Sequence, residues 1–205
     1  MILTTWGYTL TDVDTLPDLL TEEEFNIDTA NKYSGDVRIK PEIKAAESAI
    51  RNYVGWHLAG SLDCLFEVRA RSKNISTVFH DTIIQLPARY VSEIKSVLID
   101  GAEAEDYEIQ TNGILTVFDL IPDKRNSKIS VQYVAGLTDP MLDAVKDIVM
   151  HRVTHALANS YGIQSESSGG VSVTYSATWA NTARATALAS DNKEVLEPYR
   201  LQGVF

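Results

Sequence analysis

Apolar residues recur at helical spacing in one segment near residue 50. Between residues 41 and 58 they fall three or four positions apart, at Ile43, Ala46, Ile50, Tyr53 and His57. This spacing predicts a helix over residues 41–58 with one buried face. Pro41 suits its first position, because the missing N–H would have no helical partner there.

A second apolar stripe predicts a longer helix over residues 140–160. Asp139 is a candidate N-cap, and Pro140 suits the first helical position. The face predicted to be buried is broad and comprises Leu142, Val145, Ile148, Val149, Val153, Ala156 and Leu157.

Between these helices, residues 61–136 change to short alternating runs typical of β-strands. Asp100-Gly101 and Asn112-Gly113 are turn dipeptides that favour hairpins. Five or six short strands joined by such turns predict a small antiparallel β insertion.

The ends of the chain show weaker patterns. Residues 1–20 have no hydrophobic period and are expected to form an extended acidic arm that needs a partner surface. Thr21 and Glu24 fit a capping box before a short helix. After a polar loop at 165–170, the pattern predicts a strand at 171–176 and a helix at 191–199. We therefore expect a single α+β domain, a helical base interrupted by the β insertion and followed by a C-terminal strand and helix.

Charge is concentrated in two acidic segments of this 205-residue chain, whose formal net charge is −10. Residues 1–36 carry eight carboxylates and one lysine, and residues 100–123 carry seven carboxylates and no lysine or arginine. Such a balance argues against general binding of nucleic-acid phosphate. Either these segments are solvated surface, or they repel an anion such as DNA that must pass without sticking. The sequence has neither a secretory signal nor an apolar run long enough to span a membrane.

Candidate catalytic chemistry is limited to one stripe of the second helix. Asp147, His151 and His155 are spaced four apart, so a metal-dependent enzyme using His151 and His155 is one alternative. A solvated or inter-subunit polar face is favoured, because Arg152 stands where helical zinc proteases have glutamate. The single cysteine, Cys64, has apolar neighbours typical of a buried, inert thiol. We expect no enzyme activity, no metal and no cofactor.

One small basic cluster stands apart from the acidic balance. Arg69, Arg71 and Lys73 are too few for a general nucleic-acid patch. They could meet an acidic neighbouring protein instead.

Four motifs, in their order and spacing, resemble the head-tail connector (adaptor) proteins of long-tailed bacteriophages and gene-transfer agents. They are the helix Ile39–Trp56; Ile84-Gln85-Leu86-Pro87 followed by the Asp100-Gly101 turn; Ile129 to Gly136 leading into the long helix; and Val171 to Tyr175 with Leu196 to Arg200 near the end. The resemblance covers roughly residues 20–200. The acidic arm and the insert after Val68 depart from it.

The resemblance implies a connector in the neck of the virion, assembled in the host cytoplasm. It implies a homo-oligomeric ring, usually of twelve copies, beneath the portal protein, which joins the DNA-filled head to the tail. Partners would be the portal and a stopper or tail-completion protein, with DNA passing through unbound. A stopper or tail-completion protein is the alternative within the same neck.

The resemblance also suggests where partners would bind. Residues 165–205 would be the segment that docks on the portal, through Val171, Val173, Tyr175, Leu196, Tyr199 and Arg200. The acidic loops would line the DNA channel, through Glu103, Glu105, Asp106 and Glu108.

Overall fold

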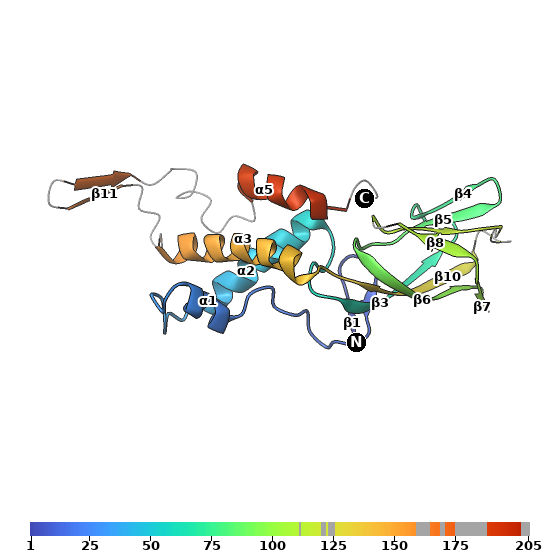
Figure 1. The fold of residues 1–205 in the computed structure, drawn as a ribbon, viewed down its shortest axis with the longest axis horizontal. Coiled ribbons are helices and arrows are strands. Elements are labelled where there is room, and N and C mark those ends of the chain that lie inside the picture. Colours follow the sequence, from blue (N-terminus) through green and yellow to red (C-terminus); the bar gives the residue numbers. More distant parts are fainter. Residues whose placement is uncertain are drawn as a thin grey trace. The chain divides into compact units, whose positions relative to one another are not determined.

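The computed structural model describes residues 1–110, 112–119, 122, 126–158, 165–168, 171–174 and 188–201. The chain divides into two compact units. Unit 1 comprises Met1–Pro17, Arg51–Leu142 and Glu197–Phe205, and unit 2 comprises Asp18–Ile50 and Asp143–Leu196. Helices and antiparallel sheets together make a mixed α+β fold, as the sequence predicts (Figure 1).

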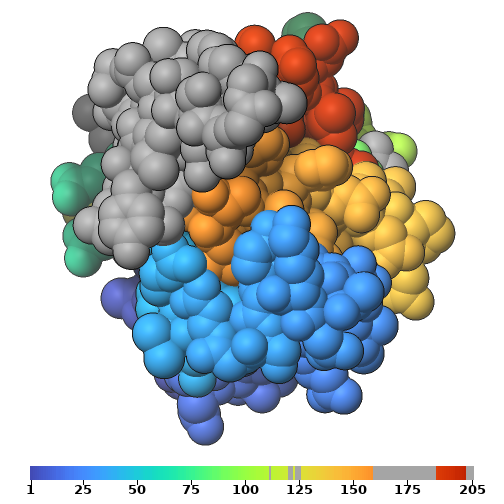
Figure 2. Space-filling view, turned by 90° about the vertical axis from the view of Figure 1, so that its left-hand side faces the viewer, coloured from blue at the N-terminus to red at the C-terminus, as the bar shows by residue number. Residues whose placement is uncertain are grey.

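Unit 2 is built on helices that bury one apolar face each. The capping box at α1 (Glu22–Asp28) is confirmed, since the Thr21 hydroxyl accepts from the Glu24 amide and the Glu24 carboxylate accepts from the Thr21 amide. Lys146 of α3 (Asp139–Ala158) donates to Glu24 at 2.6 Å. In Figure 2, the blue segment that holds α1 accordingly lies beside orange α3.

The helix predicted at 41–58 is α2 (Ile39–Val54), which ends earlier than predicted. Gly55 adopts a φ of +84° immediately after it, a left-handed conformation that terminates helices. His57 therefore lies in the following loop, although it is fully buried. The helix predicted at 140–160 is confirmed as α3, with Val145, Val149 and Val153 in the core. Asp139 is its first residue rather than its cap, and the carbonyl of Thr138 accepts from the amides of Met141 and Leu142.

The C-terminal part of unit 2 confirms one predicted strand and one predicted helix. β12 (Val171–Thr174) falls within the strand predicted at 171–176. Its partner β11 (Ser165–Ser168) was predicted as loop, because a run of serines gives no apolar alternation. α5 (Ser190–Leu196) continues into a 3₁₀ turn at Glu197–Tyr199, so the helix predicted at 191–199 is confirmed with a tighter last turn.

Unit 1 contains two antiparallel sheets where the sequence suggested one (Figure 1). The six-stranded sheet has the order β1-β2-β3-β10-β6-β7, and the four-stranded sheet has the order β4-β5-β9-β8. Their strands are β1 (Ile2–Leu3), β2 (Thr9–Leu10), β3 (Leu62–Arg69), β4 (Ile75–Val78), β5 (Asp81–Gln85), β6 (Val91–Ile99), β7 (Ala102–Glu103), β8 (Tyr107–Ile109), β9 (Ile114–Val117) and β10 (Lys128–Ala135).

The core of unit 1 lies on the inner face of the larger sheet. Alternate residues of β3 and β10 are buried there, among them Phe66, Val131 and Tyr133. The acidic arm takes part, because β2 pairs with β3 and Tyr8 is buried. The surface that this part of the arm needs is therefore provided by its own chain.

Candidate partner-binding surfaces

The C-terminal segment, defined as Glu197–Leu201, is bonded to the rest of unit 1 through its backbone. The Leu201 amide donates to the carbonyl of Val54, at the end of α2, at 2.9 Å. The indole N–H of Trp56 donates to the Tyr199 carbonyl at 2.7 Å, and Arg89 donates to the Arg200 carbonyl at 3.0 Å. These bonds fix the path of the chain just before its last four residues.

Side chains reinforce this attachment. The Tyr53 hydroxyl donates to the Glu197 carboxylate at 2.8 Å, which raises the pKa of Tyr53. The Arg200 guanidinium lies 5.2 Å from the centre of the Tyr53 ring, within the range of a cation–π contact. The ring of Tyr90 lies between those of Trp56 and Tyr199, with centroids 6.3 and 5.9 Å away.

The six residues suggested for portal docking fall in different surroundings. Leu196 is fully buried in the core, so its side chain offers no surface to a partner. Tyr199 is half-buried and Arg200 is exposed. Val171 and Val173 lie on β12, whereas Tyr175 is outside the described residues. Among the described side chains of these six, Arg200 is therefore the one that is exposed, although it also lies 3.6 Å from the Glu197 carboxylate.

The four carboxylates suggested for the DNA channel lie together along one short stretch, which we call the acidic edge. Glu103 ends β7, Glu105 and Asp106 follow it, and Glu108 lies in β8. All four are exposed, whereas Ala104 between them is buried and holds the stretch to the fold. Among the residues that the structure describes, no ion pair involves these carboxylates. The acidic edge therefore presents negative charge that no described cation pairs with.

Two turns with left-handed residues position the acidic edge. Asp100 and Gly101 have φ values of 51° and 85°, which allow the tight turn from β6 into β7 that their sequence predicts. The predicted hairpin at Asn112-Gly113 is also confirmed, since β8 pairs with β9 and Gly113 has a φ of 83°. Both turns follow from local sequence.

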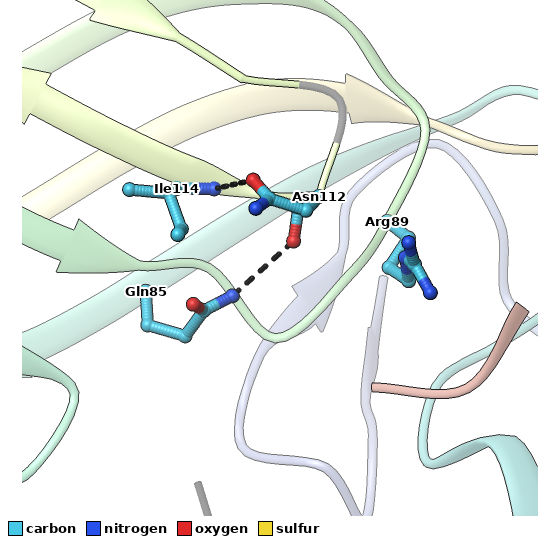
Figure 3. A pocket seen from close by; sticks show the side chains of 4 residues that line it. All are labelled: Gln85, Arg89, Asn112 and Ile114. Carbon is cyan, nitrogen blue, oxygen red and sulfur yellow. Dashed lines mark hydrogen bonds between the residues drawn. The ribbon is translucent and has the colours of Figure 1, made fainter. Parts of the chain in front are cut away.

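A shallow pocket near this hairpin is lined by Gln85, Arg89, Asn112 and Ile114 (Figure 3). Its polar groups already serve the fold. Gln85 donates to the Asn112 carbonyl at 3.4 Å, and the Asn112 side chain accepts from the Ile114 amide at 3.2 Å. Since Arg89 is bonded to the C-terminal segment, the pocket lacks convergent groups suited to catalysis.

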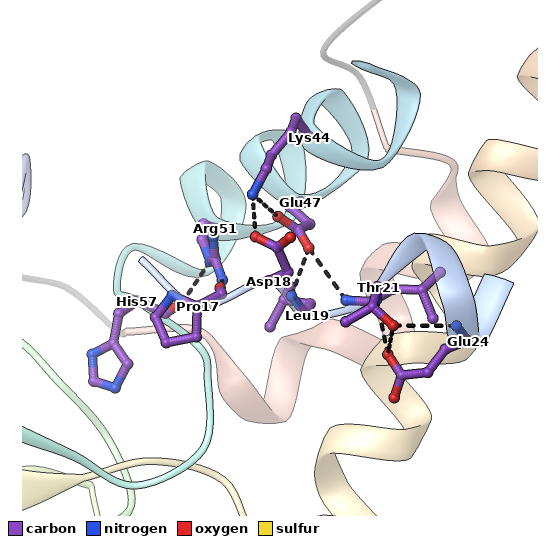
Figure 4. Close-up of polar contacts among 10 residues, drawn as sticks. Pro17, Asp18, Leu19, Thr21, Glu24, Lys44, Glu47, Arg51 and His57 are labelled. Atoms are coloured by element: carbon purple, nitrogen blue, oxygen red, sulfur yellow. Dashed lines mark hydrogen bonds and ion pairs between the residues drawn. The ribbon is translucent and has the colours of Figure 1, made fainter. Parts of the chain in front are cut away.

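Two charged side chains of α2 are buried, which the sequence reasoning missed (Figure 4). In unit 2, the Glu47 carboxylate accepts from the Leu19 and Leu20 amides at 2.5 and 3.2 Å. In unit 1, the Arg51 guanidinium donates to the carbonyls of His57 and Pro17. Both bind backbone, so both hold chain segments in place. Glu47 lies four residues after Ile43, on the apolar stripe itself, and that position was the available signal.

The metal alternative gains no support from the geometry. His151 and His155 lie exposed on α3 beside exposed Asp147. Among the described residues, no group of three or more histidine, cysteine or acidic side chains is arranged to hold a metal ion. Burial raises the pKa of the Cys64 thiol to about 12, as fits the inert cysteine that the sequence predicts.

Comparison with known proteins identifies the family. A family model described as head completion protein matches residues 18–201, nearly the whole chain. No curated protein matches the chain significantly. None of the described helices is long and apolar enough to cross a membrane. The extent of the match is decisive: the chain belongs to the head completion protein family, whose members are structural proteins of the phage head and neck.

Proposed function

We propose that this protein is the adaptor of a tailed-phage neck. It forms a ring of about twelve copies beneath the portal, receives the stopper or tail-completion protein on its other side, and lets DNA pass. The observation that carries the proposal is the family match over residues 18–201. Virion assembly in the host cytoplasm and the non-enzymatic role follow from the same proposal.

The acidic edge supports a role beside moving DNA. Fixed cations along a channel would hold phosphate, whereas exposed carboxylates repel it and keep the strand away from the wall. Four exposed carboxylates within six residues provide such a surface. In the proposed ring they face the channel.

The C-terminal segment supports a role in portal docking. Its backbone bonds to Val54, Trp56 and Arg89 fix the position of residues 199–201. Arg200 is exposed there and could pair with a carboxylate of the portal. Val171, Val173 and Tyr175 are proposed as a second portal contact, while Leu196 acts from the core by holding α5 in place.

The test is to add the purified protein to tailless, DNA-filled heads that lack it, and to image the portal vertex by negative stain. We expect added density at one vertex of each head. Portal-free heads are the control and should stay bare. Bare vertices on portal-containing heads at high protein concentration would contradict the proposal.

The same heads distinguish the stopper alternative. An adaptor binds the bare portal directly, whereas a stopper binds only after another neck protein has been added. Order-of-addition experiments with a neck extract therefore separate the two roles. Direct binding to bare heads supports the adaptor.

A further inference from the structure

The tip of the β4–β5 hairpin, residues 78–81, exposes a large aromatic side chain. Phe79 has 93% of its surface exposed, the highest fraction among the large apolar residues that the structure describes. Its φ is +57°, a left-handed conformation that bulky residues rarely adopt. The ring stabilises nothing in its own fold, so this backbone outlier points to a role outside the chain.

A pocket of matching size opens at the other end of the same sheet. The pocket in Figure 3, which we call the Arg89 pocket, has a volume of about 170 Å³. An apolar cavity of about 150 Å³ holds benzene, so an aromatic ring fits a space of this size. The lining suits a ring as well, because a guanidinium stacks on aromatic faces and Ile114 provides an apolar wall.

Phe79 is too far along the sheet to fill the Arg89 pocket of its own chain. Asp81, the first residue of β5, pairs with Val78 at the tip, whereas Gln85, the last residue of β5, lines the pocket. Four residue steps along the strand separate these two positions, about 13 Å. A ring in the pocket must therefore come from another molecule.

Charge differs between the two ends of the sheet. At the tip, the Asp81 carboxylate accepts from the amide of Asp119, so two acidic residues lie together there. At the pocket, Arg89 is part of the lining, and residues 85–92 and 109–118, which include the whole lining, contain no carboxylate. A contact between tip and pocket joins opposite charges, whereas a contact between two tips would bring carboxylates together.

We propose that the Phe79 ring of one copy fills the Arg89 pocket of the next, in a head-to-tail contact between copies of this chain. The Arg89 guanidinium then stacks on the ring and faces the acidic residues beside it. A heterologous contact of this kind generates a ring of subunits when its rotation closes. The contact deepens the proposed adaptor function and rests on it for that closure.

The contact leaves free the surfaces assigned to other partners. The acidic edge reaches the four-stranded sheet at β8, which is two strands, about 10 Å, away from β5. Arg200 is not part of the pocket lining, and its guanidinium lies against the Tyr53 ring of α2. The proposed channel wall and the proposed portal residue therefore stay outside the pocket.

Photocrosslinking from position 79 identifies what the ring touches. Phe79 is replaced by a phenylalanine analogue with a diazirine on its ring, and the protein is irradiated on tailless heads. We expect a crosslinked dimer whose joined peptide contains residues 85–89 or 112–114. The same analogue at exposed Ser76, about 10 Å back along β4, is the matched control and should give far less dimer.

The outcomes separate this inference from the proposed function. Vertex density with crosslinks from position 79 to the portal, to another neck protein or to a part of the second copy outside the pocket overturns the contact and leaves the adaptor role standing. An equal dimer yield from position 76 overturns the contact as well. The expected dimer in solution with bare vertices supports the contact and removes the adaptor role. Neither density nor dimer overturns both.

A second variant measures what the ring contributes. Phe79→Asn supplies a residue that adopts left-handed conformations readily, so its melting temperature should equal or exceed that of the native protein. We expect vertex occupancy to need a protein concentration about tenfold higher, as for the loss of an aromatic anchor. Native occupancy by a stable Phe79→Asn protein would contradict the proposed place of the ring in the contact.

Discussion

The hydroxyl of Tyr8 lies 2.7 Å from Nδ1 of His57 and also accepts from the His57 amide at 3.0 Å. Nδ1 accepts a hydrogen bond from the hydroxyl, and Nε2 donates one to the Ala135 carbonyl at 3.1 Å. A neutral imidazole therefore joins three segments of unit 1: the arm, the loop after α2, and β10. Burial lowers its pKa to about 4.

Tyr8→Phe should destabilise the protein measurably. The substitution leaves Nδ1 and the amide of His57 buried without a partner, which costs about 1–3 kcal/mol of unfolding free energy. Urea denaturation followed by tryptophan fluorescence measures this cost. Tyr33→Phe is the matched control, since the Tyr33 hydroxyl bonds to none of the described residues; its effect should stay within about 0.5 kcal/mol. Equal effects of the two variants would contradict the role given to Tyr8.

Acid should weaken the protein in a window set by His57. Its pKa is lower in the folded protein than the usual 6.5, so the unfolded chain binds the proton more readily. The unfolding free energy that depends on neutral His57 is fully present above about pH 6.5 and is lost as the pH falls toward 4. The total loss is on the order of 3 kcal/mol. The pKa of Glu24 is about 2 in the folded protein, so protonation of this carboxylate lowers the unfolding free energy at still lower pH.

Unfolding free energies measured from pH 7 to pH 4 test this window. In His57→Gln the profile should be lower and distinctly flatter between pH 6.5 and 4. An unchanged slope in that variant would assign the acid sensitivity to other groups.

Trp56→Phe should loosen the C-terminal segment. The variant keeps an aromatic ring but loses the N–H that donates to Tyr199, at a cost of about 1–2 kcal/mol. Limited proteolysis and hydrogen exchange should then detect faster opening of residues 197–201. Trp6→Phe is the control, because no described residue accepts from the Trp6 indole. Equal protection of the segment in both variants would show that the Trp56 bond does not hold it.

Charge reversal along the acidic edge should slow DNA ejection. Replacing Glu103, Glu105, Asp106 and Glu108 by lysine would attract phosphate to the proposed channel wall. Replacing them by glutamine or asparagine removes the charge alone and should have a smaller effect. DNA release from tailed particles is followed by dye fluorescence. The delay that the lysines cause should become shorter as the salt concentration is raised. Ejection kinetics unchanged by the lysines would exclude these residues from the channel.

Local signals account for what could be predicted from the sequence. The Thr21–Glu24 capping box, the Asp100-Gly101 and Asn112-Gly113 turns, and the face of α3 each depend on residues within a few positions of one another. Their physical cause is contained in the local chain, so the structure confirms them.

Features that depend on distant partners were missed. His57 continues the apolar spacing of α2, and only its bonds to Tyr8 and Ala135 explain why it is buried beyond the helix end. The family resemblance assigns Leu196 to portal docking, yet its side chain fills the core. The sequence also could not show that the strands form two sheets, because alternation predicts that a segment is a strand but not which strands pair with it.

The most direct test of the central claim is complementation in vitro. Heads from a phage lacking this protein are incubated with the purified chain, then with tails and the remaining neck proteins, and infectious particles are counted. We expect DNA-filled heads to retain their genome and to yield plaques only when the protein is added before the other neck components. Equal plaque numbers without the protein, or none with it although its fold is intact, would contradict a role in completing the head.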